Sequence, residues 1–531
     1  MGEVEQRRVA IGAEGVPLDS TDEDIDREAS FAHRIFDLRE RAGRKPTGES
    51  VIVGVWDGGP VLATHAAFAD RVTVLDDTYV PSYHATHVAG IIAASGLPFL
   101  ADGDDMEGVS PRIRIASADF CEAFQVADEM RAAFDDPAAG NGTGEGARRM
   151  SVTNHSWGWA RSWSEQDYLR LAAQFDSAIK DHPGIVTVVA AGNDNPHPDN
   201  LAGPRGGAHH SVPLVYSTLR SPGIAKNVIT VGAMVDLGPG LDVANVTQDD
   251  VGPTYFSSLG PAPGGRIKPD VVANGWDIIA PSSTPFLECH APATKPFFDG
   301  CEQVSSANAD VCLRRFDGTS MATPIVSGVL ALLQDLALGW RGEALRADEA
   351  KAILIHSAIS ADNRPNYRTG WGPFDAWVAG NIVEWWSEEP VPNAGGRLFT
   401  RVALKPGATE TIRVKREEEV SVRVTAAWLD EPSTSLAPPD QIDLVVDVDL
   451  ALRSVDDPDT IMRPWVLDPT PGRESVPATR GVNDRDPVER IDLMADEGAA
   501  GVYEVLLTGS RGLPREGLTV ALVMSGLLKG E

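Results

Sequence analysis

The stretch FDGTSMATPIVSGVLALL, residues 316–333, joins a polar turn to a run of apolar and small residues. From Ile325 to Leu333 nearly every position is apolar or small, which predicts a helix that is buried on all sides. Ser320 then lies in the first turn, and Pro324 lies early enough to bend this helix without ending it. Unpaired N–H groups and the positive end of the helix dipole favour negative charge at that terminus. A serine in such a place is most often a helix cap, so its neighbours decide whether it has a chemical role.

Three other stretches also place a polar side chain where a buried element meets a loop. VIVGVWDGG is an apolar, strand-like run that ends on Asp57 before a glycine turn. HATHVAGIIAA begins with His84 and continues as an apolar helix. TVVAAGNDN is a third buried run, and it ends at Asn193. The chain order of the candidate groups is therefore Asp, His, Asn, Ser.

These stretches resemble the signature motifs of the subtilisin-like serine peptidases, the subtilase family. Residues 318–324 match the serine motif G-T-S-M-A-x-P at every defined position. The histidine motif H-G-T-H-V-A-G is matched with Ala85 in place of its first glycine. The aspartate motif D-[ST]-G is matched at its first and last positions only, because Gly58 replaces the residue with a hydroxyl. Shorter matches lie between these motifs, so that the resemblance spans roughly residues 49–380. Several motifs in one order are far more specific than any single motif.

The resemblance implies catalytic roles for four residues. A serine hydroxyl is a weak nucleophile at neutral pH and needs an adjacent base, which a histidine supplies. Ser320 is then the nucleophile that forms an acyl-enzyme, His84 takes its proton, and Asp57 holds the imidazole in the useful tautomer. The side-chain amide of Asn193 and the Ser320 N–H are the expected donors to the oxyanion. We therefore expect a serine endopeptidase that acts on proteins or peptides.

Other functions are weighed against this expectation. A catalytically silent or partner-activated binding protein on a subtilisin fold is the alternative, and the presence of all four candidate residues speaks against a silent one. An esterase or lipase fits poorly, because residues 318–322 lack the second glycine of the G-x-S-x-G elbow. Broad degradation and dedicated processing of one partner both stay open.

The resemblance also implies which residues line the substrate site. Two stretches are expected at the main side-chain pocket, while extended backbone pairs with the substrate as an added strand. Trp157, where leucine is frequent in the family, is expected to narrow the pocket wall. Trp159 and Trp163 either extend that wall or pack in the core. The expected pocket residues are Ser156, Trp157, Gly158, Ala191 and Gly192; the floor of the pocket has no assignment.

Composition places the chain among globular proteins with an acidic surface. Of its 531 residues 42% are hydrophobic and 23% are charged, which excludes wholesale disorder. The formal net charge is −31 and the sequence pI is about 4.7, which argues against nucleic acid or an anionic membrane as a partner. A solvated acidic surface is the simplest reading; a preference for basic substrates, or adaptation to salt, is the alternative. The oligomeric state is not determined.

Periodicity divides the chain into three parts. Residues 1–48 are a polar N-terminal extension, with an amphipathic helix expected over 21–39. In residues 49–388 strand-like and helical runs alternate, which predicts an α/β domain with a mostly parallel sheet flanked by helices. After a Pro/Gly-rich link, residues 396–531 contain short alternating runs that predict an antiparallel β-sandwich. This last part resembles the jelly-roll domain of proprotein convertases and some bacterial subtilases.

Ions and location are the least determined features. Structural Ca²⁺ is usual in the family, and no organic cofactor is expected. Two groups of oxygen ligands would suit this ion, although a solvated carboxylate run is the simpler reading. They are Asp102, Asp104, Asp105 and Glu107, and then Asp447, Asp449, Asn483, Asp484 and Asp486.

No membrane span is expected, and the first residues lack the apolar core of a secretory signal. A cytoplasmic location is therefore favoured, and a secreted one applies if a signal has been removed. Cys289, Cys301 and Cys312 lie close enough in sequence for one disulfide in an oxidising compartment, with reduced thiols as the equal alternative.

Overall fold

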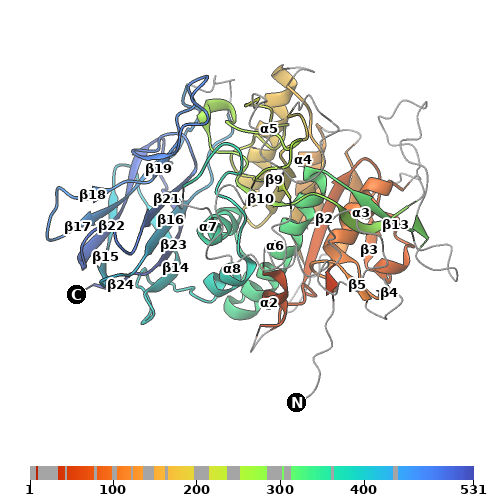
Figure 1. Cartoon of the computed structure of the whole chain (residues 1–531), viewed down its shortest axis with the longest axis horizontal. Helices are drawn as coiled ribbons and strands as arrows, with labels where there is room; N and C mark the ends of the chain where they lie inside the picture. Colours follow the sequence, from red (N-terminus) through yellow and green to blue (C-terminus); the bar gives the residue numbers. More distant parts are fainter. Residues whose placement is uncertain are drawn as a thin grey trace, which may run out of the picture.

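A computed structural model of the chain shows a sheet covered by helices, followed by two packed antiparallel sheets (Figure 1). The structure describes residues 8–9, 34–41, 45–76, 81–98, 105–120, 124–135, 149–161, 165–195, 215–235, 252–283, 302–303, 312–359, 364–433 and 441–530. Of the helix expected over residues 21–39, only the end is described, as α2 (Ile35–Arg39). Trp163, Asp102 and Asp104 lie outside the described residues.

Seven described strands form the main sheet, and every neighbouring pair in it is parallel. Strands β2, β8 and β9 are buried along their whole length and β7 is buried after Arg149, as expected when helices cover both faces. The α/β prediction is confirmed. In spatial order the strands are β10 (Val271–Asn274), β9 (Ile229–Met234), β8 (Val186–Ala190), β7 (Arg149–His155), β2 (Val51–Asp57), β6 (Arg114–Asp119) and β3 (Val72–Val74).

Alternate side chains of β2 point into two separate cores. Val53 and Val55 belong to the core that contains α3 (Tyr83–Ala93) and α6 (Thr319–Arg341). Ile52 and Trp56 belong to the core beneath α4 (Val126–Asp135) and α5 (Glu165–Asp181). This period of two is what a strand imposes on its side chains, and it places the two helix layers on opposite faces of the sheet.

Helix α6 is the buried helix that the sequence predicts. Every side chain from Met321 to Ala337 is buried, and the helix contacts β7, β8, β9 and β10. It ends at Gly342, whose φ of 76° is left-handed and suits glycine. Among the described helices α6 alone has the length and apolar composition of a membrane span, and 94% of its most apolar window is buried inside the protein. In this structure α6 is therefore a core helix.

The C-terminal part consists of antiparallel strands in two main sheets that enclose a third core. Side chains alternate between that core and the surface, as in β15, where Ile412 and Val414 point inward between exposed neighbours. The predicted β-sandwich is confirmed; its jelly-roll connectivity and the boundaries 48, 388 and 396 stay predictions. One sheet contains β14 (Arg397–Leu404), β23 (Leu518–Ser525), β16 (Val422–Ala427) and β21 (Val488–Leu493). The other contains β18 (Ile461–Met462), β17 (Asp447–Ser454), β22 (Gly501–Arg511), β15 (Thr409–Arg416) and β24 (Leu528–Lys529).

Shorter elements complete the described fold. They include α7 (Ala347–Ser357) and α8 (Ala376–Val383), which lie between the two parts in Figure 1. The remaining strands are β1 (Arg8–Val9), β4 (Leu97–Pro98), β5 (Asp105–Glu107), β11 (Ile278–Ser282), β12 (Glu302–Gln303), β13 (Cys312–Phe316), β19 (Trp465–Val466) and β20 (Thr479–Arg480). Two 3₁₀ turns, η2 (Ala66–Phe68) and η5 (Pro263–Gly265), lie in loops.

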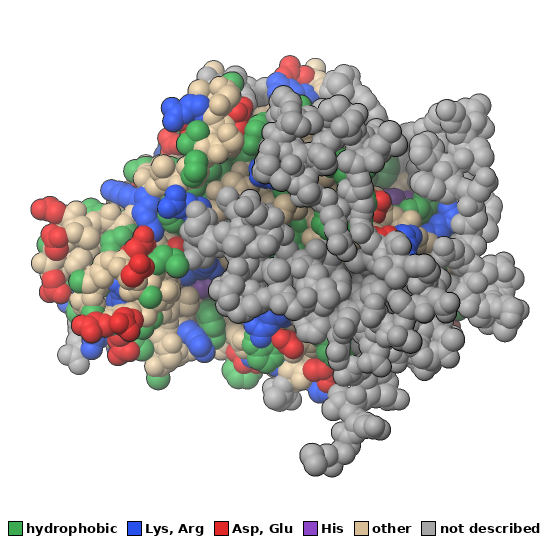
Figure 2. Space-filling model, in the orientation of Figure 1, with side chains coloured by type: hydrophobic (Ala, Val, Ile, Leu, Met, Phe, Trp, Pro, Cys, Tyr) green, Lys and Arg blue, Asp and Glu red, His purple; other side chains and the backbone are tan. Residues whose placement is uncertain are grey.

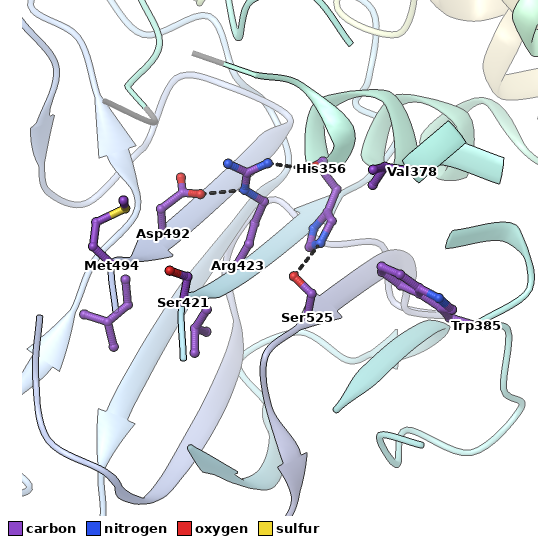
Figure 3. Close-up of a pocket in the computed structure, with 10 residues that line it drawn as sticks. His356, Val378, Trp385, Ser421, Arg423, Asp492, Met494 and Ser525 are labelled. Carbon is purple, nitrogen blue, oxygen red and sulfur yellow. Dashed lines mark hydrogen bonds and ion pairs between the residues drawn. The ribbon is translucent and has the colours of Figure 1, made fainter. Parts of the chain in front are cut away.

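An ion-paired network joins α7 to the C-terminal sandwich. Arg423 Nη1 donates to the backbone oxygens of His356 and Ala358, at 2.6 and 3.0 Å, and Arg490 Nη1 donates to Ile355 O at 2.9 Å. Both arginines bind the buried carboxylate of Asp492. The carbonyls at the end of α7 thus receive arginine donors from the sandwich, which is what a helix C-terminus requires. A pocket of about 190 Å³ lies beside this network (Figure 3).

Part of the acidic excess is displayed on the sandwich. Figure 2 shows acidic side chains gathered at the end of the molecule that the C-terminal strands form. Glu417, Glu418, Asp456, Asp457 and Asp459 are exposed there, in the loops after β15 and β17. Solvated carboxylates of this kind agree with the simplest reading of the net charge.

Candidate active site

The carboxylate of Asp57 lies at the C-terminal end of β2, where the strand meets its loop. The side chain is only 2% exposed. Its Oδ1 accepts a hydrogen bond from Gly58 N at 2.7 Å, so a backbone N–H serves this carboxylate although residue 58 has no hydroxyl. The backbone is also tied, because Phe120 N donates to Asp57 O at 2.9 Å. The carboxylate is therefore held in place by backbone hydrogen bonds that do not involve His84.

His84 is the second residue of α3 and faces Asp57. Its Nδ1 lies 2.8 and 2.9 Å from the two carboxylate oxygens of Asp57. The start of α3 is capped by Ser82, whose Oγ accepts from Ala85 N and whose own N–H donates to Pro60 O in the loop after β2. Because a carboxylate only accepts, Nδ1 carries the proton, and the lone pair of the neutral ring is on Nε2. The imidazole is 23% exposed.

Ser320 is the second residue of α6, and it is tied to the 156–158 stretch. Its Oγ donates to Ser156 O at 2.9 Å, and the Oγ of Ser156 donates to Ser320 O at 2.8 Å. The N–H of a residue at this place in a helix has no partner within the helix. The serine therefore combines a partly buried hydroxyl with a backbone donor at the positive helix end.

Asn193 lies just after β8 and is oriented by the residue before Ser320. Its Oδ1 accepts from Thr319 N at 3.0 Å and from Thr319 Oγ1 at 2.9 Å. These two donors identify the oxygen, so the amide nitrogen is on the other side of the group. A methyl group on Gly318 would come within 3.4 Å of Asn193 Nδ2, and the φ of Gly318 is 155°. Glycine at 318 thus suits both the backbone and the approach of the amide.

The expected pocket residues lie in two segments that flank this helix start. Ser156, Ala191 and Gly192 are buried beside it, and Gly192 N donates to Thr319 Oγ1 at 3.2 Å. Trp157 is only 8% exposed, and its indole stacks on Phe120 with ring centroids 4.7 Å apart, while its place in the pocket wall stays a prediction. Trp157 therefore contributes mainly to the core.

A residue outside every motif also lies at these two segments. The carbon stem of Arg220 contacts both Gly158 and Gly192, and its guanidinium binds Asp194. No sequence signal points to Arg220, because it belongs to none of the motifs and lies 62 residues after Gly158. Packing alone identifies it.

Buried histidines around the site have other tasks. His87, one turn after His84 in α3, is fully buried, and burial lowers its pKa to about 3. Its Nε2 lies 3.0 Å from Arg314 O, a bond that joins α3 to β13. A neutral, buried ring is suited to structural support and not to proton transfer near neutral pH.

Several of the carboxylates expected as calcium ligands have protein partners in the part of the chain that is described. Asp486 accepts from Ile267 N and Asn483 Nδ2, Asp449 binds Ser510 Oγ, and Glu107 pairs with Arg39. No group of three acidic, histidine or cysteine side chains among the described residues is arranged to hold a metal. Asp102 and Asp104 lie outside those residues, and calcium binding stays a prediction for both groups.

Known proteins are similar to this chain over about two thirds of its length. A family model described as the subtilase family matches residues 48–372, close to the range expected from the motifs. Serine protease AprX of Bacillus subtilis (strain 168) is 28% identical over 366 residues, which cover 64% of this chain and 67% of that protein. Fervidolysin of Fervidobacterium pennivorans is 28% identical over 417 residues, which cover 71% of this chain and 47% of that protein.

Among solved structures, the self-cleaved protease domain of PatA is 21% identical. The match covers 64% of this chain and 98% of that chain, with a TM-score of 0.41. The chain thus spans about two thirds of AprX and about half of fervidolysin.

Proposed function

Because this chain belongs to the subtilase family, we propose that it is a serine endopeptidase that hydrolyses peptide bonds through an acyl-enzyme on Ser320. The observation that carries the proposal is the contact of 2.8 Å between His84 Nδ1 and Asp57 Oδ1. This contact keeps the proton on Nδ1, so Nε2 is left to act as a base. The substrates proposed are proteins and peptides.

Acylation begins when the Ser320 hydroxyl turns from Ser156 O toward His84. Nε2 takes the proton as Oγ attacks the carbonyl carbon, and the carbonyl electron pair moves onto its oxygen. The imidazolium that forms is stabilised by the Asp57 carboxylate, which stays ionised. Collapse of the tetrahedral intermediate breaks the C–N bond, and the proton on Nε2 passes to the leaving amine.

The oxyanion needs donors that are already in place. The N–H of Ser320 is free of helix bonding, and the Asn193 amide nitrogen lies beside Gly318, with its oxygen anchored by Thr319. Donors held in this way stabilise the charge without reorganising. In deacylation a water molecule gives a proton to His84 as it attacks the acyl carbon, and the same donors stabilise the oxyanion. Collapse of this second intermediate breaks the ester C–O bond, and the proton on Nε2 returns to Ser320 Oγ.

Substitution of the nucleophile tests the proposal. Ser320→Ala is expected to abolish both peptide hydrolysis and covalent labelling by a fluorophosphonate, while the melting temperature stays close to that of the wild type. Ser510→Ala removes a serine hydroxyl from the exposed face of β22 and serves as the matched control, with full labelling expected. Labelling of the Ser320→Ala variant would overturn the assignment.

A partner-activated peptidase is the second candidate, and one observation favours it. The Ser320 hydroxyl donates to Ser156 O, and this bond has to be given up before its proton can pass to a base. A partner that displaces this bond would activate the enzyme. Wild-type protein that alone neither cleaves short peptides nor is labelled by a fluorophosphonate, and that gains both activities when a partner protein is added, supports this candidate.

A further inference from the structure

We propose that Arg220, held by Asp194, determines which substrate side chain is accepted immediately before the scissile bond, and that it admits small uncharged side chains. The inference rests on the proposed function, because it concerns the acyl group that Ser320 would carry. It names a residue that the motifs do not contain and a class of cleavage site.

The position of Arg220 follows from the two segments beside Ser320. Ser156 O accepts from Ser320 Oγ, and Gly192 N donates to the side chain of Thr319, so both segments border the attacking group. The subtilase resemblance implies that these two segments line the main side-chain pocket, so a substrate side chain on the acyl carbon is expected to enter between them. The two glycines, Gly158 and Gly192, lie along this space and have no side chains to fill it.

The stem of Arg220 fills that space against both glycines. A methyl group on Gly158 would come within 2.7 Å of Arg220 Cβ. A methyl group on Gly192 would come within 2.8 Å of Arg220 Cγ and 3.2 Å of its Cδ. One aliphatic stem is thus in contact with both segments, and a large substrate side chain would have to displace it.

Several bonds hold Arg220 in this place. Its backbone N–H donates to Ala191 O at 2.9 Å, and its Nη1 donates to Gly158 O at 3.2 Å. Nη2 donates to Asp194 Oδ1 at 2.7 Å, and Nε binds the other oxygen of the same carboxylate. A bidentate pair of this kind fixes the plane of the guanidinium. The side chain is therefore anchored at its base and at its head.

The charge of Arg220 adds a second selection, against charged substrate side chains. The guanidinium repels a lysine or arginine side chain of the substrate, and both oxygens of Asp194 already accept from Arg220. A substrate carboxylate has to compete with Asp194 for the same donors. The indole of Trp157 points into the core, so it offers little apolar wall to a large side chain. Small uncharged residues such as alanine and serine meet neither obstacle.

Cleavage-site profiling of a peptide library by mass spectrometry tests the inference with the full-length chain. The wild type is expected to cleave after small uncharged residues. Arg220→Ala opens the space. The ratio of kcat/KM for a peptide with phenylalanine before the scissile bond to kcat/KM for the same peptide with alanine there should be at least about tenfold higher in this variant than in the wild type. Arg220→Met keeps a long stem without the charge, so it should still exclude phenylalanine.

A remote arginine provides the control. Arg453→Ala removes an arginine that is paired with Glu504 on the C-terminal sandwich, and its cleavage profile should match that of the wild type. A wild-type preference for large apolar, basic or acidic residues overturns the inference, and this result needs no variant to fold. So does an Arg220→Ala profile identical to that of the wild type at an unchanged melting temperature. Failure of the proposed function looks different: the wild type then neither cleaves any peptide nor reacts with a fluorophosphonate.

Discussion

Two regions of the molecule each hold a histidine by hydrogen bonds to other side chains, and the two rings differ in exposure and in their partners. In the candidate active site His84 is partly exposed and faces the carboxylate of Asp57. At the junction with the C-terminal sandwich His356 is buried, with Nδ1 at 3.0 Å from Thr425 Oγ1 and Nε2 at 3.1 Å from Ser525 Oγ (Figure 3). The nearby aspartate, Asp492, binds arginines instead of the imidazole.

The difference shows that environment and not residue type assigns the chemistry. Burial is the main cause that lowers the pKa of His356 well below its usual value, and the nearby Arg423 and Arg490 lower it further. Both ring nitrogens of His356 are occupied by hydroxyl partners, so the ring acts as a neutral brace between α7 and the sheet. His84 has a carboxylate that favours its charged form, as a base requires in the transition state.

The largest predicted effect is the loss of activity when His84 is replaced by alanine, compared with the same replacement at His356. His84→Ala should lower kcat by about 10⁶-fold, because the base is lost, while the free energy of unfolding hardly changes. His356→Ala should leave kcat unchanged and lower the free energy of unfolding by roughly 1–3 kcal/mol, because two hydroxyl groups lose their partner. Steady-state kinetics and urea unfolding measure the two effects. A loss of kcat in the His356→Ala variant, with its fold intact, would contradict the purely structural role of His356.

The next effect concerns the carboxylate at the junction. Asp492→Ala should lower the free energy of unfolding by about 3–5 kcal/mol, because it leaves Arg423 and the fully buried Arg490 without their partner. Burial raises the pKa of Asp492, but Arg423 and Arg490 outweigh it and hold this pKa at about 2, from an ordinary value of 3.8. The stabilisation that these two ion pairs add to the folded state is therefore complete above about pH 4 and is lost as the pH falls toward 2.

Urea unfolding of wild type and Asp492→Ala at several pH values measures this dependence. The difference between the two proteins should narrow below pH 4. Asp457→Ala changes an exposed carboxylate that lies on the sandwich and provides the control, with little change expected. A difference that stays constant from pH 7 to pH 2 would contradict the role of the Asp492 carboxylate.

The smallest effect of the three sharpens the assignment of the catalytic centre. Asn193→Ala should lower kcat by about 10²–10³-fold with little change in KM, a magnitude taken from this family's own oxyanion donor, because the donor acts on charge that develops in the transition state. Initial rates over a range of peptide concentrations separate the two constants. A rise in KM at unchanged kcat would show that the Asn193 amide binds substrate and does not stabilise the oxyanion.

Much of the fold was predictable because the local pattern of apolar and polar residues indicates which elements form and which faces are buried. The unbroken apolar run of α6 predicts burial on all sides, and the alternation in β15 predicts a half-buried strand; both are observed. The pocket wall was less predictable, since Trp157 reads as a pocket residue by its place in a motif and yet its ring stacks on Phe120 in the core. Motif position determines where the backbone runs, whereas the direction of a large side chain depends on the space that other elements leave.

By itself the sequence determined the candidate residues Asp57, His84, Asn193 and Ser320, because each ends or begins a buried element and so must lie at an edge of the fold. Only the tertiary structure decided that Arg220 lies between Gly158 and Gly192, and that Arg423 and Arg490 share Asp492 beneath α7. The physical reason is distance along the chain. Periodicity and motifs extend over a few residues, but an arginine that fills a gap or shares a carboxylate is selected by packing between segments tens of residues apart.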